Sequence, residues 1–232
     1  MARISVMAVL AFAAAAALIG AATLSIAARA TVLAPAPRRA APAPSAAAQT
    51  IVLAGGCFWG VQAVFQHVDG VTRAVSGYAG GKLPHPTYEQ VSTGDTGYAE
   101  SVKVTFDPRQ IGLGEILRIY FSVAHDPTEI NRQGPDEGTQ YRSEIFAGDA
   151  AQANFARGYI GELDAAKVYA RPIATKVETN AAFYPAEGYH QNYATLHPGE
   201  PYIAFNDAPK IAALKRLFPA RYREKPVLVA AE

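Results

Sequence analysis

The 232-residue chain has a single cysteine, and its charges nearly cancel, with 21 Lys and Arg against 20 Asp and Glu. One cysteine permits no internal disulfide, so the fold cannot depend on one. The charge balance offers neither a basic field of the kind that binds nucleic acid nor an acidic tail. The five histidines are scattered without the spacing of metal ligands, so the sequence predicts no metal site. The length suffices for one sizeable domain with a buried core.

The first thirty residues are apolar and rich in alanine. They carry an early arginine and end in Ala28-Arg29-Ala30, a small-x-small pattern that is typical of a cleaved secretory signal. Because the apolar run is about as long as a membrane span, an uncleaved anchor is the alternative. We therefore expect residues 1–30 to export the chain, to the periplasm, with or without membrane attachment. Residues 31–49, mostly Ala, Pro, Ser and Thr, are expected to form a linker without a core of its own.

The rest of the chain alternates strand and helix patterns. Apolar or alternating runs predict strands at 50–54, 101–106 and 173–177, with β-favouring residues from 70 to 81. Helical stripes lie at 61–68, 113–124, 156–163, 187–196 and 209–218. This order predicts an α+β fold, a two-layer sandwich of an antiparallel-rich sheet with helices and a ferredoxin-like (split βαβ) core. We expect this domain to span 50–222, with 223–232 as a tail.

The stretch from 126 to 143 has no clear period and is long for a connection. It is polar, and it contains Gly134-Pro135-Asp136 among other turn-forming residues. Connections of this length are typically mobile or functional.

Cys57 stands in Gly55-Gly56-Cys57-Phe58-Trp59-Gly60, at the predicted join of a strand and a helix. A free cysteine is commonly a buried, unreactive hydrophobe. A helix start, however, stabilises the thiolate, which is the nucleophilic form. The glycines leave room beside the sulfur, and two adjacent large aromatics cannot both lie on the buried helical stripe. On these residues alone, packing and chemistry stand as equal alternatives.

Further blocks follow this motif in order along the chain. They are GYAGG at 77–81, PTY at 86–88, STGDTG at 92–97, Ala99-Glu100, His125-Asp126-Pro127, GTQYRS at 138–143 and YHQNY at 189–193. Together with GCFWG at 56–60, these blocks resemble the A-type methionine sulfoxide reductases, the peptide-methionine (S)-S-oxide reductases, over about residues 50–200. The resemblance implies that the S epimer of methionine sulfoxide, free or in proteins, is reduced to methionine.

The resemblance also implies the two residues that carry the chemistry. Cys57 corresponds to the nucleophile that attacks the sulfoxide sulfur, and Glu100 to the acid that protonates the sulfoxide oxygen. A sulfoxide oxygen leaves poorly unless it is protonated, so the acid must keep its proton near neutral pH. Burial among aromatic side chains would raise the pKa of Glu100 in that direction.

Five more residues correspond to the family's substrate site. Tyr88 and Tyr141 match phenols that hydrogen-bond the sulfoxide oxygen, Asp136 matches an acidic residue of the site, and Phe58 and Trp59 match the walls around the substrate methyl group. Each has a plainer alternative, because most tyrosines pack in cores or lie on surfaces, and turn chemistry alone explains Asp136.

The chain departs from many relatives in having no second cysteine. In those relatives, further cysteines near the C-terminus resolve the sulfenic acid as an internal disulfide, whereas residues 225–232 here contain none. The product Cys57-SOH must then be reduced by an external thiol, either a thioredoxin-like or glutaredoxin-like protein or a small thiol. We expect no bound cofactor, methionine-sulfoxide-containing proteins as partners, and a monomer.

Two other classes of function compete with this interpretation. A cysteine hydrolase or acyltransferase would pair Cys57 with His67, His125 or His190 as general base, although no signature of such enzymes surrounds the cysteine. An exported binding module would use the two aromatics after Cys57 as an apolar patch. His190 and Asn192 either belong to the site or pack the predicted helix at 187–196, and packing is favoured.

Overall fold

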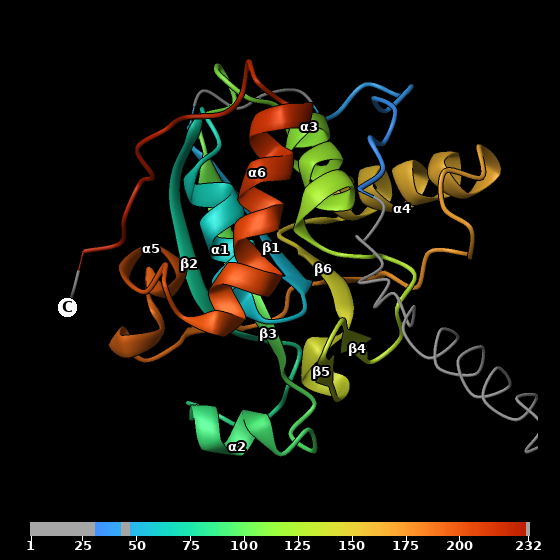
Figure 1. Ribbon diagram of the computed structural model, residues 1–232. Helices are drawn as coiled ribbons and strands as arrows, with labels where there is room; N and C mark the ends of the chain where they lie inside the picture. The colour runs from blue at the N-terminus through green and yellow to red at the C-terminus, as the bar shows by residue number, and fades with distance from the viewer. Residues whose placement is uncertain (1–30, 43–46, 231–232) are drawn as a thin grey trace, which may run out of the picture. The chain divides into compact units, whose positions relative to one another are not determined.

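The apolar run before Cys57 forms the central strand of a six-stranded sheet. The computed structural model describes residues 31–42 and 47–230, so the expected signal at 1–30 lies outside the described residues. Strand β1 (Gln49–Gly55) pairs antiparallel with β3 (Ala99–Phe106) and β6 (Ser143–Ala147). Strand β2 (Val71–Ala79) pairs antiparallel with β3 and with the edge strand β8 (Phe183–Pro185). The other edge, β7 (Lys176–Thr179), runs parallel to β6, so the sheet order is β7-β6-β1-β3-β2-β8 (Figure 1).

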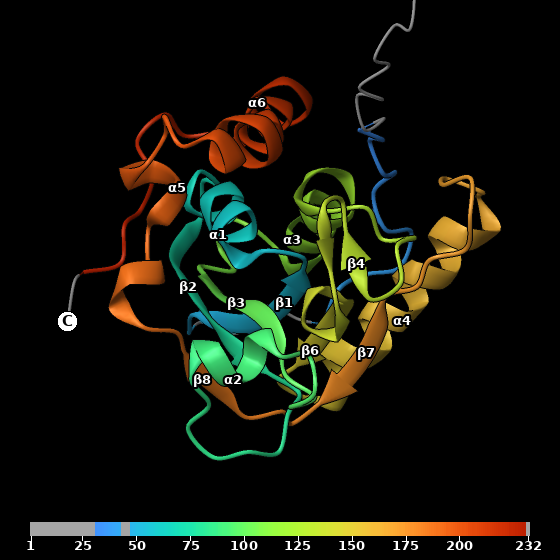
Figure 2. The same cartoon turned by 60° about the horizontal axis from the view of Figure 1, so that its bottom comes forward.

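Helices bury one face of this sheet. They are α1 (Phe58–Gln66), α3 (Leu113–Ile119), a π-helical turn η1 (Tyr120–Ala124), α4 (Ala150–Ala165) and α6 (Ala208–Leu217). Figure 2 shows α6 lying over α1, and α1 over the sheet. Apolar residues of the helices and of alternate strand positions form one large core. The opposite face carries a smaller cluster under residues 181–183. An α+β fold of sheet and helices is therefore confirmed.

Short elements gather at the end of the sheet where β1 meets α1. They include α2 (Tyr88–Ser92), β4 (Arg132–Gln133), β5 (Asp136–Glu137) and the 3₁₀ turn η2 (Thr139–Tyr141), and Figure 1 shows α2 and β5 at this end. The aperiodic stretch 126–143 thus folds into β4, β5 and η2. The helix expected at 187–196 is two short turns, η3 (Gly188–His190) and α5 (Tyr193–Leu196), and η4 (Ile203–Asp207) precedes α6.

The segment at 31–42 differs from the free linker that its composition predicts. It contains no helix or strand, yet it docks onto α3, η1 and α4. The Ala34 N–H donates to Ser122 Oγ at 2.9 Å, and the Tyr159 hydroxyl donates to the Pro35 carbonyl at 2.6 Å. Ala34 is fully buried. A segment that cannot build a core can still share the core of its neighbour, and here it satisfies its backbone groups there.

The C-terminal residues also pack against the domain. The Val227 N–H donates to the Gln66 carbonyl, and Asn192 holds both backbone groups of Val229 through its side-chain amide. The Gln66 side-chain amide also donates to Asn192 Oδ1 at 2.7 Å, so Asn192 joins the C-terminal segment to the end of α1. Among the described residues, none of the helices has the length and apolar character needed to cross a membrane.

Candidate active site

Cys57 occupies the N-cap position of α1, one residue after the turn that ends β1. Gly56 makes this turn with φ +86°, and a Cβ at this position would lie 2.5 Å from Gln133, so the position requires glycine. Cys57 is free and only 8% exposed. Burial raises the pKa of its thiol, and the charges of Glu100 and Asp207 raise it further, whereas the Trp59 N–H and Lys210 lower it.

Glu100, near the start of β3, faces the same helix start. Its Oε2 accepts a hydrogen bond from the Phe58 N–H at 3.0 Å, and the side chain is buried. Burial raises the pKa of Glu100 to about 8, against the opposing effect of the Phe58 N–H and with help from Asp136 and Asp207. Glu100 is therefore largely a neutral carboxylic acid at pH 7, beside a thiol.

The predicted polar residues of the site come together from three short elements. Tyr88 begins α2, Asp136 lies on β5, and Tyr141 ends η2. Tyr88 and Tyr141 are half-buried, and burial raises the pKa of both phenols, with further contributions from Glu100, Asp136 and Cys57. Both phenols therefore remain neutral donors over the working pH range, next to the sulfur and the acid.

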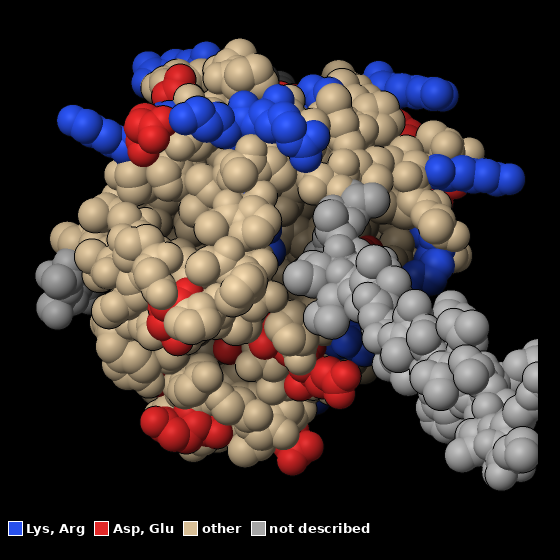
Figure 3. Space-filling model, in the orientation of Figure 1, with Lys and Arg blue, Asp and Glu red and all other residues tan. Residues whose placement is uncertain are grey.

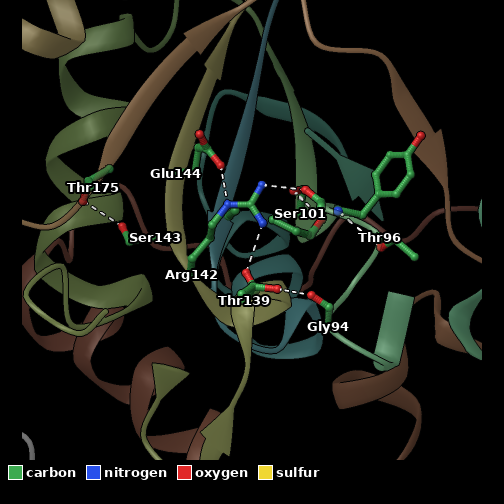
Figure 4. A network of polar contacts seen from close by, with 12 residues as sticks. Gly94, Thr96, Ser101, Thr139, Arg142, Ser143, Glu144 and Thr175 are labelled. Carbon is green, nitrogen blue, oxygen red and sulfur yellow. Dashed lines mark hydrogen bonds and ion pairs between the residues drawn. The ribbon is translucent and has the colours of Figure 1, made fainter. Parts of the chain in front are cut away.

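Arg142 holds the turn that carries Tyr141 (Figure 4). Its guanidinium donates to Glu144 at 2.6 Å, to the Thr139 carbonyl at 3.0 Å and to the Gly97 carbonyl at 3.0 Å. The Thr139 hydroxyl in turn donates to the Gly94 carbonyl. One arginine thus joins η2 and β6 to the loop that leads into β3, the strand of the buried acid.

Replacing Arg142 by methionine is expected to destabilise the fold by about 3 kcal/mol, because the Glu144 side chain, 1% exposed, would lose its cation. Such a loss corresponds to a melting temperature lower by roughly 6–12 °C. Thermal unfolding followed by circular dichroism measures it. Arg109→Met is the matched control, since Arg109 pairs with Asp107 while remaining 74% exposed, and it should change the melting temperature little. Equal melting temperatures for the two variants would contradict the expectation.

The two aromatics after Cys57 have different surroundings. Phe58 is buried, with its ring 5.0 Å from His190 and 5.9 Å from Tyr78. Trp59 is half-buried and stacks on Tyr193 at 3.8 Å. Its indole N–H donates to His190 Nδ1 at 3.2 Å. Burial lowers the pKa of His190, so the ring is neutral and orients the indole.

Sequence reasoning missed Tyr202, which caps the start of η4, and the residues that η4 and α6 bring to the site. The Tyr202 hydroxyl donates to Asp136 Oδ2 at 2.5 Å, and the Tyr202 ring meets Trp59 edge-on at 6.0 Å. Asp207 and Lys210 lie against Gly60, where a Cβ would come within 2.0 Å of Asp207 Oδ1. The second glycine of GCFWG was the available signal, because a glycine inside a helix often marks a close approach.

The charge around this end of the molecule is mostly negative. Figure 3 shows Asp and Glu side chains gathered near α2 and β5, with a smaller group of Lys and Arg beside them and a larger one toward the opposite end of this face. Within 31–42 and 47–230, no group of three or more His, Cys, Asp or Glu is arranged to hold a metal ion.

This arrangement defines a class of protein. A thiol at a helix start lies beside a carboxylic acid that keeps its proton, with neutral phenols around both. Such a site can attack an electrophilic sulfur while protonating the oxygen that leaves it. The fold and the site together define an α+β protein in which a free cysteine at a helix start faces a buried carboxylic acid.

Comparison with known proteins identifies the particular family. The model of the family "Peptide methionine sulfoxide reductase" matches residues 49–222. A peptide methionine sulfoxide reductase of Mesorhizobium japonicum is 60% identical over 181 residues, covering 78% of this chain and 93% of its own. One from Thermus thermophilus is 47% identical, covering 74% and 96%. The chain belongs to the peptide methionine sulfoxide reductase family.

Solved structures agree with this assignment. The reduced form of Mxr1 from Saccharomyces cerevisiae superposes with a TM-score of 0.61 at 35% identity, covering 70% of this chain and 91% of that one. Methionine sulfoxide reductase A of Corynebacterium diphtheriae gives 0.56 at 34% identity, covering 72% and 89%. The chain is therefore similar to these reductases over most of their length.

Proposed function

We propose that this chain reduces the S epimer of methionine sulfoxide, free or in proteins, to methionine. The observation that carries the proposal is the buried acid Glu100, with a pKa of about 8, bonded to the helix start that holds Cys57. Family membership supports the same reaction. Repair of oxidised methionine in proteins follows as the role.

The first half of the reaction uses Cys57 and Glu100. The Cys57 thiolate attacks the sulfoxide sulfur, and the Glu100 carboxylic acid transfers its proton to the sulfoxide oxygen. Resolution of the adduct gives methionine and Cys57-SOH: the substrate sulfur is reduced by two electrons and the cysteine sulfur is oxidised by two. Tyr88 and Tyr141 donate hydrogen bonds to the oxygen while negative charge grows there.

Asp136, Phe58 and Trp59 complete the proposed substrate site. Asp136 is held by the Tyr202 hydroxyl at the rim, and the indole of Trp59 is held by His190 and Tyr193. An indole fixed on two sides provides a rigid apolar wall for the substrate methyl group. Phe58 closes this wall from the buried side.

The second half of the reaction requires a thiol from outside the chain. Cys57 is the only cysteine, so no internal disulfide can form. We propose a thioredoxin-like protein as the donor, with a glutaredoxin-like protein or a small thiol as alternatives, and no bound cofactor. A thiol of the donor condenses with the sulfenic acid, and its proton leaves with the hydroxyl group as water while a mixed disulfide forms. A second donor thiolate then attacks the donor sulfur of this disulfide and releases Cys57 as thiolate.

Turnover of the two separated epimers of N-acetylmethionine sulfoxide with dithiothreitol tests the proposal. We expect the S epimer to be consumed and the R epimer to remain. Equal consumption of both epimers, or of neither, would overturn it. Hydrolysis of p-nitrophenyl acetate provides a second measurement, and an acyl intermediate at Cys57 would favour a hydrolase. The geometry gives little support to that class, because each candidate base has other partners. His67 contacts the Arg223 carbonyl, His125 contacts the Tyr120 carbonyl and the Ser143 hydroxyl, and His190 accepts from Trp59.

Strand order supports a split βαβ core. In the order β6-β1-β3-β2 each strand is antiparallel to its neighbours, and the four strands are joined in the order β1, α1, β2, β3, α3, β6. We propose that they form a ferredoxin-like core to which β7 and β8 are added as edges. We also propose that the catalytic domain, residues 50–222, acts as a monomer.

We further propose that residues 1–30 export the chain to the periplasm. Support comes from the sequence alone, from the apolar run and Ala28-Arg29-Ala30. Fractionation of cells that express the full chain, followed by N-terminal sequencing, tests this. A periplasmic protein that begins at Thr31 is the expected result, an intact chain in the membrane fraction would indicate an anchor, and a cytoplasmic protein would contradict export.

A further inference from the structure

Asp207 and Lys210 form a buried ion pair that the proposed reaction does not yet use. Lys210 Nζ lies 3.0 Å from Asp207 Oδ1, and the two side chains are 11% and 0% exposed. The other carboxylate oxygen, Asp207 Oδ2, is buried and has no hydrogen-bond partner among the described residues. A buried ion pair is weak evidence for stability, and an unpartnered buried oxygen is costly. The pair therefore points to a role other than holding the fold together.

The pair lies on the first turn of the helix that begins at Cys57. A Cβ on Gly60 would stand 2.0 Å from Asp207 Oδ1 and 2.7 Å from Lys210 Nζ. Any side chain at position 60 would displace both charges. The glycine three residues after Cys57 thus permits α6 to place one cation and one anion against the turn whose N–H groups face the sulfur.

Among the described titratable side chains around Cys57, carboxyl groups outnumber cations. The side chains that face Cys57 or its partners are Glu100 on β3, Asp136 on β5, Tyr88 on α2, Tyr141 on η2, His190 on η3, Tyr202 just before η4, Asp207 at the end of η4 and Lys210 on α6. His190 is neutral, since burial lowers its pKa. Lys210 lowers the pKa of the thiol, against the larger opposing effects of Glu100 and Asp207.

We propose that Lys210, held by Asp207 against the first turn of α1, is a positioning residue that stabilises the Cys57 thiolate. It acts through the sulfur and does not touch the substrate. The proposal rests on the proposed function, and it gives Lys210 a role at two steps of the cycle. Before attack on the sulfoxide, the ammonium favours ionisation of the thiol. After the donor has formed a mixed disulfide with Cys57, it favours departure of Cys57 as thiolate.

The release step shows why the cation matters in a chain with one cysteine. A second donor thiolate attacks the donor sulfur of the mixed disulfide, the bond to Cys57 breaks, and the electron pair goes to the Cys57 sulfur. A leaving thiol of lower pKa departs faster. Because the chain has no resolving cysteine, Cys57 is regenerated through this exchange. Stabilisation of the Cys57 thiolate by Lys210 therefore increases the rate of its release in every catalytic cycle.

Alkylation of the free enzyme tests the proposal without any turnover. Because Cys57 is the only cysteine, the rate of its modification by iodoacetamide as a function of pH reports its pKa alone. Lys210→Met should raise that pKa by about one unit, because a charge of the stabilising sign is lost in a partly buried site. Asp207→Asn should lower it by a similar amount, since a destabilising charge is lost. Lys210→Arg should restore the native profile.

The two substitutions are expected to shift the Cys57 pKa in opposite directions, and this distinguishes an electrostatic role of the pair from a purely structural one. If the pair only packed α6 against α1, both substitutions would leave the alkylation pKa unchanged or move it in the same direction, and either result would overturn the proposal. Lys215→Met is the matched control, because Lys215 lies on the same helix and pairs with Glu224 in solvent. Failure of the epimer assay with an intact pattern of alkylation shifts would contradict the proposed function while leaving this inference standing.

Discussion

Cys57→Ser is expected to abolish methionine sulfoxide reduction, with a loss of at least about 10⁴ in kcat. A serine hydroxyl fits the same space, but it does not ionise near the pKa of a thiol, and an oxygen nucleophile cannot take up the sulfoxide oxygen as a sulfenic acid does. The measurement is turnover of the S epimer with dithiothreitol, with the native chain beside the variant. Circular dichroism should show an intact fold, because the substitution changes one buried atom.

The same reaction without a reductant tests what Cys57 becomes. One equivalent of the S epimer should yield one equivalent of methionine and a sulfenic acid that dimedone traps, mapped to Cys57 by mass spectrometry. The sulfenic acid should persist, because the chain holds no second thiol to resolve it. Recovery of an unmodified thiol after methionine has formed would contradict this mechanism. Residual activity of Cys57→Ser above the buffer rate would contradict the role of the nucleophile.

The sequence predicts the parts of the fold whose residues repeat with a clear period. Strands β1 and β3 and helices α1, α3 and α6 lie where their apolar patterns indicate, since each buries one side against the core. Short elements were not foreseen. Strand β8 has three residues and α2 has five, and neither is long enough to show a period. The docked segment at 31–42 was missed because it shares a core that other parts of the chain build.

The candidate site divides in a similar way. A glycine-flanked cysteine before an apolar helix can be recognised from local physics, whereas Glu100, Tyr88 and Tyr141 could be identified only through the resemblance. Asp207 and Lys210 escaped both approaches. They lie about 150 residues from Cys57 in the chain, and only the packing of α6 on α1 brings them to it. Gly60, the second glycine of the motif, indicates that another segment packs closely there, but it does not indicate which residues that segment brings.

Glu100→Gln is expected to lower kcat by a factor of about 10²–10⁴, the usual contribution of a general acid. The amide oxygen can still accept the Phe58 N–H, so the geometry survives, but an amide has no proton to give to the sulfoxide oxygen. In the native enzyme the acid is lost as pH rises through about 8, the pKa of Glu100, while burial keeps the pKa of Cys57 above its usual value, so the rise of kcat/KM that follows ionisation of Cys57 should level off above about pH 8. The variant should lack this levelling and keep the full rise that follows ionisation of Cys57. Glu224→Gln, on the exposed pair with Lys215, is the control.

At high pH, the Glu100→Gln variant should be less active than the native chain but more stable against unfolding. The pKa of Glu100 is raised in the folded chain, so its protonated form favours folding fully below about pH 4.5, and this stability is lost as pH rises through about 8. Above pH 8 the buried carboxylate costs on the order of a few kcal/mol, which a neutral glutamine does not. At pH 9, Glu100→Gln should therefore melt at a higher temperature than the native chain, and the difference should shrink toward pH 5. A variant that loses activity and melts lower at every pH would show that Glu100 holds the fold and not the proton.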